Sequence, residues 1–322
     1  MRARSAAAAR LAVAAARGFG VRPLIVAIAL LIPAAGLSQQ TGITAAPQVA
    51  RAYDLILDAN FAELEKVLPS TCPPAPVVAC RGLEALSLWW RIQLDLDSRA
   101  LDAAFLESVD RAIAEATKFT EAEPRRAEAW FYLGAAYGVR SQFRVYRKER
   151  LAAARDGKRI KEALEQALLL DPSMHDAEFG IGMYRYYAGV APAAFRFLRF
   201  LLLLPGGDRH GGLHQLERAA QRGVLVRGEA QYQIHMLYLW YENRPKDALT
   251  LLRQLQARYP HNPLFRHIEA EVLDVYFHDH AASLTASQQL LALAHARKVF
   301  HPDIAEKLAR RNITRQQRAL QQ

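Results

Sequence analysis

Apolar residues recur along this chain with the spacing of α-helices. Downstream of residue 38, almost every segment repeats apolar positions at helical intervals, and short stretches with Pro, Gly and Asp separate these segments. The alternating Val, Ile and Thr runs with Asn-Gly turns that are typical of β-hairpins do not occur. The pattern therefore predicts an all-α protein in which antiparallel helices are joined by short turns.

One segment indicates that the helices repeat. The 34 residues from Glu229 to Asn262 place Tyr232 at a large first position and Ala248 at a small position where two helices cross. Pro260 follows twelve residues after Ala248. The small residue lets the two helices approach closely, and the proline prevents the second helix from continuing. We therefore expect a helical hairpin that is one unit of an array.

A second unit is longer. It opens with the pattern Trp130, Leu133, Gly134 and Tyr137, and it closes at Pro172. Its excess length corresponds to about two additional turns on each helix. We place the turn between its helices near Arg147 to Glu149, and the periodicity leaves Asp156-Gly157 as an alternative.

A third unit begins at Phe179, and its second helix covers Gly211 to Arg222. Between its helices lies an apolar run of twelve residues, Ala193 to Leu204, which contains Arg196 and Arg199. This run is too short and too charged to span a membrane. We expect a buried helix inserted into the repeat, with an interfacial membrane helix as the alternative.

These residues resemble the tetratricopeptide repeat family, most specifically over 229–262. The basic stretch Arg155–Lys161 and the segment Leu204–Arg209 are similar to a long-helix variant of that family found in exported bacterial proteins of unknown function. The resemblance implies a tetratricopeptide-like α-solenoid whose usual work is holding other proteins. It also favours the turn near Arg147 and carries no catalytic residues.

The chain divides into four parts on this interpretation. We expect a signal peptide at 1–38, N-terminal hairpins at 39–126, repeats at 127–297 and a basic C-terminal helix at 298–322. The array should contain about four to five hairpins. Trp89 and Trp90 are expected to seal the first N-terminal hairpin, Val49 to Leu68, onto the array.

The first 38 residues resemble a secretory leader. Five arginines and no acidic residue precede an apolar stretch from Leu24 to Ala35, and Gly36 and Ser38 suit a cut before Gln39. We therefore expect a periplasmic or secreted protein. An uncleaved segment that anchors the protein remains the alternative.

The net charge of +10 does not by itself indicate a partner, because it is unevenly distributed along the chain. Five of the basic residues belong to the expected leader, and much of the remaining excess lies after Leu293. The body of the chain is close to neutral. The distribution therefore argues against a nucleic-acid partner.

Cys72 and Cys80 are the only cysteines, and they bound a short Pro-rich loop. In an exported chain this arrangement predicts one disulfide, with two unpaired thiols as the alternative. Two cysteines without further ligands at metal-binding spacing do not favour a metal site.

Other candidates for chemistry have simpler explanations. His210, His214 and Glu217 share a helix face, but Gly211 and Gly212 weaken the helix that would hold a metal. Asp208 after two glycines, and Asp279 between two histidines, are interpreted as helix caps. The chain contains none of the motifs that mark hydrolases, zinc proteases or nucleotide-binding loops. We expect no cofactor and no enzymatic activity, although an enzyme without a recognisable motif stays an alternative.

Basic residues cluster on the long hairpin, where Arg140, Arg144 and Arg147 share one helix face. A solvated hairpin tip is one interpretation. The other is an envelope-associated adaptor in which basic elements contact anionic lipid, so that peripheral membrane contact remains an alternative.

The resemblance also implies a binding surface, because the first helix of each repeat lines a concave groove in this family. Its offsets, carried onto this chain, select Phe131, Tyr184, Tyr187, Gln233, Leu237, Trp240 and Tyr241. Exposed aromatic residues in a groove are frequent binding anchors. The leading hypothesis is therefore a scaffold that binds a protein or peptide. The same side chains could instead pack against each other or against another segment.

Overall fold

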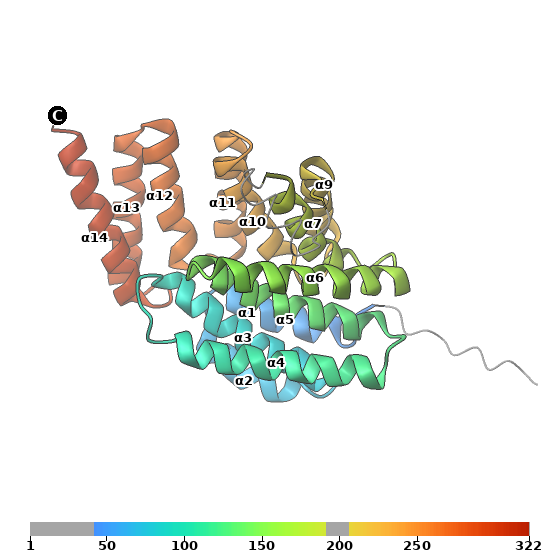
Figure 1. Cartoon of the computed structure of the whole chain (residues 1–322). Coiled ribbons are helices and arrows are strands. Elements are labelled where there is room, and N and C mark those ends of the chain that lie inside the picture. The colour runs from blue at the N-terminus through green and yellow to red at the C-terminus, as the bar shows by residue number, and fades with distance from the viewer. Residues whose placement is uncertain (1–41, 191–205, 322) are drawn as a thin grey trace, which may run out of the picture. The chain divides into compact units, whose positions relative to one another are not determined.

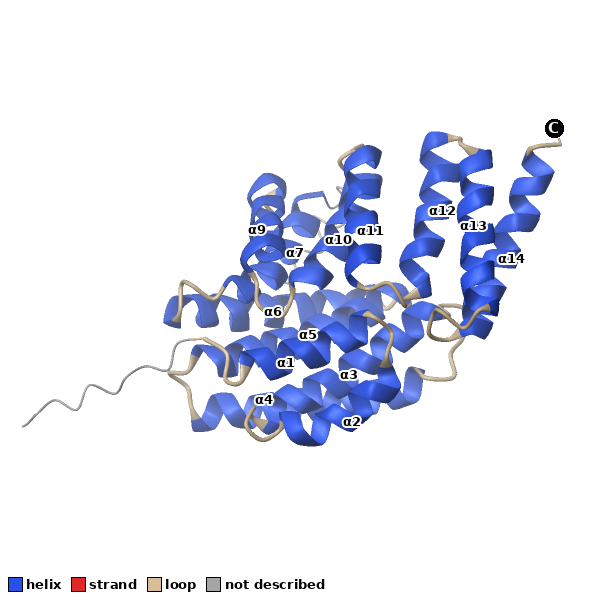
Figure 2. Cartoon of the chain, turned by 180° about the vertical axis from the view of Figure 1, so that it is seen from behind, coloured by secondary structure: helices blue, strands red, loops and turns tan. Residues whose placement is uncertain are grey.

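The structure, a computed structural model, describes residues 42–190 and 206–321 (Figure 1). All regular secondary structure in this part of the chain is helical, which confirms the all-α prediction (Figure 2). The expected leader and the apolar run from Ala193 to Leu204 lie outside the described residues. The helices are α1 (Ala46–Leu57), α2 (Phe61–Thr71), α3 (Val77–Leu94), α4 (Asp102–Ala122), α5 (Ala127–Tyr146), α6 (Arg150–Leu170), α7 (His175–Val190), α9 (Arg209–Arg222), α10 (Arg227–Trp240), α11 (Pro245–Arg258), α12 (Pro263–Phe277), α13 (His280–His295) and α14 (Pro302–Ala319).

Consecutive helices pack as hairpins. The described residues form six such pairs, α1/α2, α3/α4, α5/α6, α7/α9, α10/α11 and α12/α13, and α14 packs against α12 and α13. The array is thus longer than the four to five hairpins expected. The pairs at its two ends have weak repeat signals, yet their helices still bury an apolar stripe and pair in the same way.

Local signals set the helix boundaries. Asp208 and Asp279 accept hydrogen bonds from the backbone N–H groups of Gly211 and Ala282, both at 2.9 Å, as expected of helix caps. In the long hairpin, α5 ends at Tyr146 and α6 begins at Arg150. The turn therefore lies at Arg147 to Glu149, and Gly157 is inside α6.

Small residues permit close helix crossings. Ala248 is fully buried where α11 packs against α10. Between α7 and α9 the backbones themselves touch, because a Cβ on Gly182 would lie 2.8 Å from the carbonyl oxygen of Gly212. A side chain at either glycine would push these helices apart.

Cys72 and Cys80 form a disulfide that joins the end of α2 to the first turns of α3. The two cysteines are separated by 8 positions. By loop-closure entropy, a bridge across so short a loop contributes about 2–3 kcal/mol of stability.

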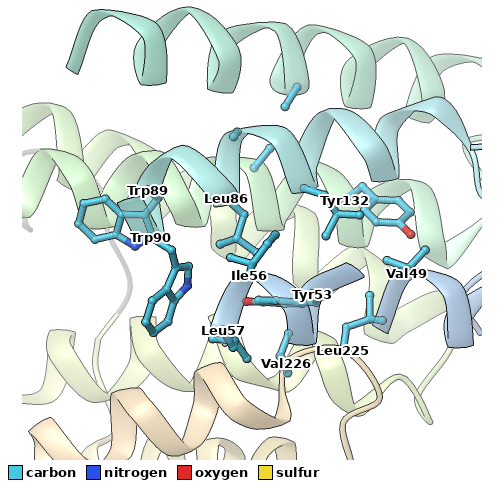
Figure 3. Close-up of a cluster of buried hydrophobic side chains, with 14 of the residues drawn as sticks. Val49, Tyr53, Ile56, Leu57, Leu86, Trp89, Trp90, Tyr132, Leu225 and Val226 are labelled. Carbon is cyan, nitrogen blue, oxygen red and sulfur yellow. The ribbon is translucent and has the colours of Figure 1, made fainter. Parts of the chain in front are cut away.

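The N-terminal hairpins pack onto the C-terminal half of the chain. In α1, Asp54 accepts a hydrogen bond from the Tyr259 hydroxyl at 2.7 Å, and the Leu57 carbonyl accepts one from the Asn262 amide at 2.6 Å. Figure 3 shows Leu57 on the side of α1 that faces Val226, just before α10. As a result, one continuous apolar core includes residues from α1 through α12.

The two tryptophans of α3 take part in this packing. The Trp90 ring lies 5.0 Å from that of Tyr232 in α10 and 5.9 Å from that of Phe265 in α12. Trp89 packs instead against Phe105 of α4, in its own hairpin, and against Phe143 of α5, in the next one. Trp90 therefore joins α3 to α10 and α12, and Trp89 joins α3 to α4 and α5. Among the described helices, none is both long enough and apolar enough to cross a bilayer.

Candidate functional site

A groove with a volume of about 1280 Å³ runs along the first helices of the hairpins. Its lining comes from α1, α3, α5, α7, α10, α12 and α14, with further residues from α4 and α6. In the described chain, α2, α9, α11 and α13 contribute no lining residue. We call this hollow the inner groove. Four of the six described hairpins thus contribute only their first helix to the lining, whereas α3/α4 and α5/α6 contribute both helices.

Six of the seven residues proposed as binding residues line the inner groove, and Leu237 does not. The lining six are Phe131, Tyr184, Tyr187, Gln233, Trp240 and Tyr241. They differ widely in accessibility, because Gln233 is 4% exposed, Tyr241 40% and Trp240 60%. Gln233 is covered because its amide bonds to Gln142 of α5 and to Glu229, whereas Trp240 and Tyr241 lie at the C-terminal end of α10.

Exposed apolar side chains gather around the groove. Within the described residues, ten large hydrophobic side chains are exposed, and five of them line the inner groove: Val145, Tyr146, Trp240, Tyr241 and Val275. We call these five the apolar rim. Apolar side chains that cluster at the edge of a hollow are typical of binding sites for other molecules.

Tyrosines hold one end of the groove. The rings of Tyr186, Tyr187 and Tyr241 lie 5.9 Å apart from one another in edge-on contacts. The Tyr186 hydroxyl donates a hydrogen bond to Glu242, which also pairs with Arg209 at 2.8 Å. These contacts join α7 and α9 to Tyr241 and Glu242, the two residues that directly follow Trp240 at the end of α10.

The floor of the groove is polar. Glu229, only 1% exposed, accepts hydrogen bonds from the Trp90 indole and the Gln233 amide, both at 3.1 Å. The Gln142 carbonyl oxygen accepts bonds from Trp89 at 3.2 Å and Gln233 at 3.1 Å. Burial raises the pKa of Glu229 above its ordinary value.

The repeat offsets selected Gln233 but missed Glu229 and Gln142 of this floor, although a signal for Glu229 was present in the sequence. Glu229, Gln233, Met236 and Trp240 follow one another at intervals of four, three and four residues, so they share one face of α10. All four line the inner groove. Two polar residues on the same stripe as an exposed Trp indicate a lining face rather than an ordinary core face.

Three of the basic residues on the long hairpin, those that share one helix face, pair with carboxylates of the protein itself. Arg140 binds Asp156 at 2.8 Å and Asp110 at 2.6 Å, and Arg144 binds Asp156 at 2.6 Å. Arg147 pairs with Asp102 of α4 at 2.7 Å. The face that these three arginines share is therefore neither a solvated tip nor a free basic surface. It joins α5 to α4 and α6.

The candidate metal ligands do not converge. His214 faces Glu217 through a contact of 3.2 Å, and His210 is exposed beside them. In the described ranges, no group of three or more His, Cys, Asp and Glu side chains is placed to hold a metal ion.

A buried histidine beneath the groove makes stability sensitive to acid. His235 is 1% exposed, its Nδ1 contacts the Tyr232 carbonyl, and burial lowers its pKa from 6.5 to about 4. The unfolded chain binds a proton at His235 more readily than the folded protein does. The contribution of neutral His235 to the free energy of unfolding is therefore complete above pH 6.5 and falls as the pH drops towards 4. Lowering the pH from 7 to 5 should therefore reduce the free energy of unfolding by about 2 kcal/mol through His235 alone.

Urea unfolding of the wild type and of His235→Gln at pH 7 and pH 5 measures this cost. The wild type should lose more stability than the variant by that amount. Burial also lowers the pKa of His267 and His301, so some loss should remain in the variant. Equal losses in the two proteins would show that His235 takes up its proton without unfolding.

No protein-family model matches the chain, and no curated protein matches it either. The function has to be inferred from the residues and their arrangement.

Proposed function

We propose that this protein is an exported tetratricopeptide-like scaffold that holds a polypeptide partner in the inner groove. The observation that carries the proposal is the apolar rim, since half of the exposed large hydrophobic side chains of the described residues lie around one hollow. Trp and Tyr are the residue types most often found as energetic anchors of interfaces. Trp240 and Tyr241, at the open end of α10, are the anchors that we propose.

Two further observations support the proposal. The 34-residue register from Glu229 to Asn262 places Ala248 at a helix crossing, and Ala248 is fully buried at the contact of α10 with α11. The disulfide between Cys72 and Cys80 is of the kind that persists in oxidising compartments, which supports export.

The test compares a proposed anchor with a packing residue. Twelve-residue peptides displayed on phage are selected on the wild-type protein, and the affinities of the selected peptides are then measured on variants. Trp240→Ala should weaken their binding at least tenfold, because it removes a large exposed side chain from the rim. Its melting temperature should stay near that of the wild type. Ala248→Leu should lower stability by about 1–3 kcal/mol, because it overfills a tight crossing.

The matched control is Leu169→Ala. Leu169 is 75% exposed, lies on α6 and is not part of the groove lining. Its loss should change neither binding nor stability. If Trp240→Ala unfolds the protein, or if the selected peptides bind Trp240→Ala as well as the wild type, the proposed anchor is wrong.

A further inference from the structure

The inner groove contains a buried hydrogen-bond donor that nothing in the described chain satisfies. Gln93, in the last turn of α3, lines the groove and is 6% exposed. Its amide nitrogen Nε2 has no hydrogen-bond partner among the described residues. Buried amide groups of native proteins are nearly always paired, and an unpaired one costs stability. The terminal amide turns about a soft torsion, so that it can donate to an acceptor placed in the groove.

The accessible charges of the groove balance. Two lining carboxylates, Asp176 and Glu229, are buried. The other charged lining side chains are three acids and three bases: Asp95, Asp97, Glu271, Arg150, Lys307 and Arg311. Several are already engaged, since Lys307 pairs with Asp95 at 3.0 Å, Arg311 with Asp97 at 3.9 Å and Arg315 with Glu271 at 3.6 Å. A charged occupant would find no net complementary charge here.

We infer that the inner groove takes an uncharged, apolar stretch of polypeptide, with one of its backbone carbonyl groups accepting a hydrogen bond from the Gln93 amide. This inference rests on the proposed function and specifies the chemistry of the partner. The apolar rim supplies contacts for apolar side chains, and the balanced charges disfavour strongly charged segments. Gln93 acts as a specificity residue of the groove lining.

The floor also distinguishes a polypeptide from a lipid chain. An acyl chain has no acceptor along its length, so it would leave the Gln93 donor unpaired and would lie against Glu229 and Gln233. A peptide backbone carries a carbonyl acceptor at every residue, and its apolar side chains can still contact the rim. The polar floor beneath apolar walls therefore suits a peptide better than a hydrocarbon.

The test uses three fluorescein-labelled peptides of fourteen residues, identical in their Leu, Phe and Ser positions. Three central positions carry Asn in the neutral peptide, Lys in the basic peptide and Glu in the acidic peptide. Fluorescence anisotropy with the wild-type protein should give at least tenfold tighter binding for the neutral peptide than for either charged one. Palmitate is added as a competitor, and it should not displace the neutral peptide.

Variants of Gln93 provide a signature that a purely structural role would not produce. Gln93→Leu and Gln93→Met remove an unpaired polar group, so the melting temperature should stay equal or rise. Binding of the neutral peptide should nevertheless weaken about tenfold, as expected for one lost hydrogen bond. The control is Gln215→Leu, at a glutamine that is also buried, at 8% exposed, but lies in α9 outside the lining. That control should bind like the wild type.

The outcomes separate this inference from the proposed function. Equal or tighter binding of a charged peptide, with dependence on Trp240, would overturn the inference and leave the scaffold proposal intact. Unchanged affinity of the neutral peptide for both Gln93 variants would also overturn the inference and leave the scaffold proposal intact. Displacement of the neutral peptide by palmitate would identify a lipid site and overturn the inference. If no peptide binds and selection yields no Trp240-dependent binder, both proposals fail.

Discussion

Replacing Asp176 by alanine is expected to lower the free energy of unfolding by about 3–5 kcal/mol. Asp176 lies in α7 and is 4% exposed. Its carboxylate accepts hydrogen bonds from the backbone N–H groups of Val224, Leu225 and Val226 at 3.0, 2.7 and 2.9 Å. Alanine would leave these three donors without their acceptor in the segment that leads into α10. Urea unfolding at neutral pH measures the loss.

The control for this prediction is Asp176→Asn. Its carbonyl oxygen can keep the bonds from Leu225 and Val226, which both reach the same carboxylate oxygen in the wild type. The loss should therefore be clearly smaller than for alanine. A loss below about 1 kcal/mol for Asp176→Ala would mean that the segment before α10 finds other acceptors.

The second large effect is expected at Asp156, in the long hairpin. Asp156 is 1% exposed and binds both Arg140 and Arg144, so that alanine would leave two guanidinium groups without their buried partner. Removing one partner of a buried ion pair typically costs 3–5 kcal/mol, and we expect about that loss from Asp156→Ala. Chemical denaturation of the variant, with helix content followed by circular dichroism, provides the measurement.

Asp110 offers a matched comparison, because it binds the same arginine from the surface. Its side chain is 60% exposed and lies 2.6 Å from Arg140. Exposed ion pairs contribute little, so Asp110→Ala should cost less than about 1 kcal/mol. Similar losses for the two alanine variants would show that burial does not govern this network.

Some features of the protein follow from short-range pattern alone. The helical spacing of apolar residues, the small residue at Ala248 and the proline at Pro260 act within one hairpin, and the hairpin forms as they predict. The turn at Arg147 to Glu149 did not follow from periodicity alone, which also allowed Asp156-Gly157; the resemblance favoured the turn that forms. The disulfide could be predicted because Cys72 and Cys80 are the only cysteines and lie eight positions apart.

The candidate site could be predicted only in outline. The repeat offsets selected six residues that do line the inner groove, but they also selected Leu237, which is fully buried away from it. They could not show that Gln233 is buried beside Gln142 of α5 while Trp240 is open to solvent. Offsets within one repeat contain no information about which other helix covers a given turn.

The tertiary structure alone decided how the ends of the array meet. Asp54 and Tyr259 are separated by 205 positions, and Trp90 and Glu229 by 139, yet each pair is hydrogen-bonded. Helical periodicity predicts that a residue lies on the buried face of its helix, but it does not predict which other helix packs against that face. The sequence by itself therefore determined the helices and their local pairing. The contacts of α10 with α1 and with Trp90 of α3, the polar floor and the unpaired Gln93 amide depend on contacts between distant segments, which only the folded chain brings together.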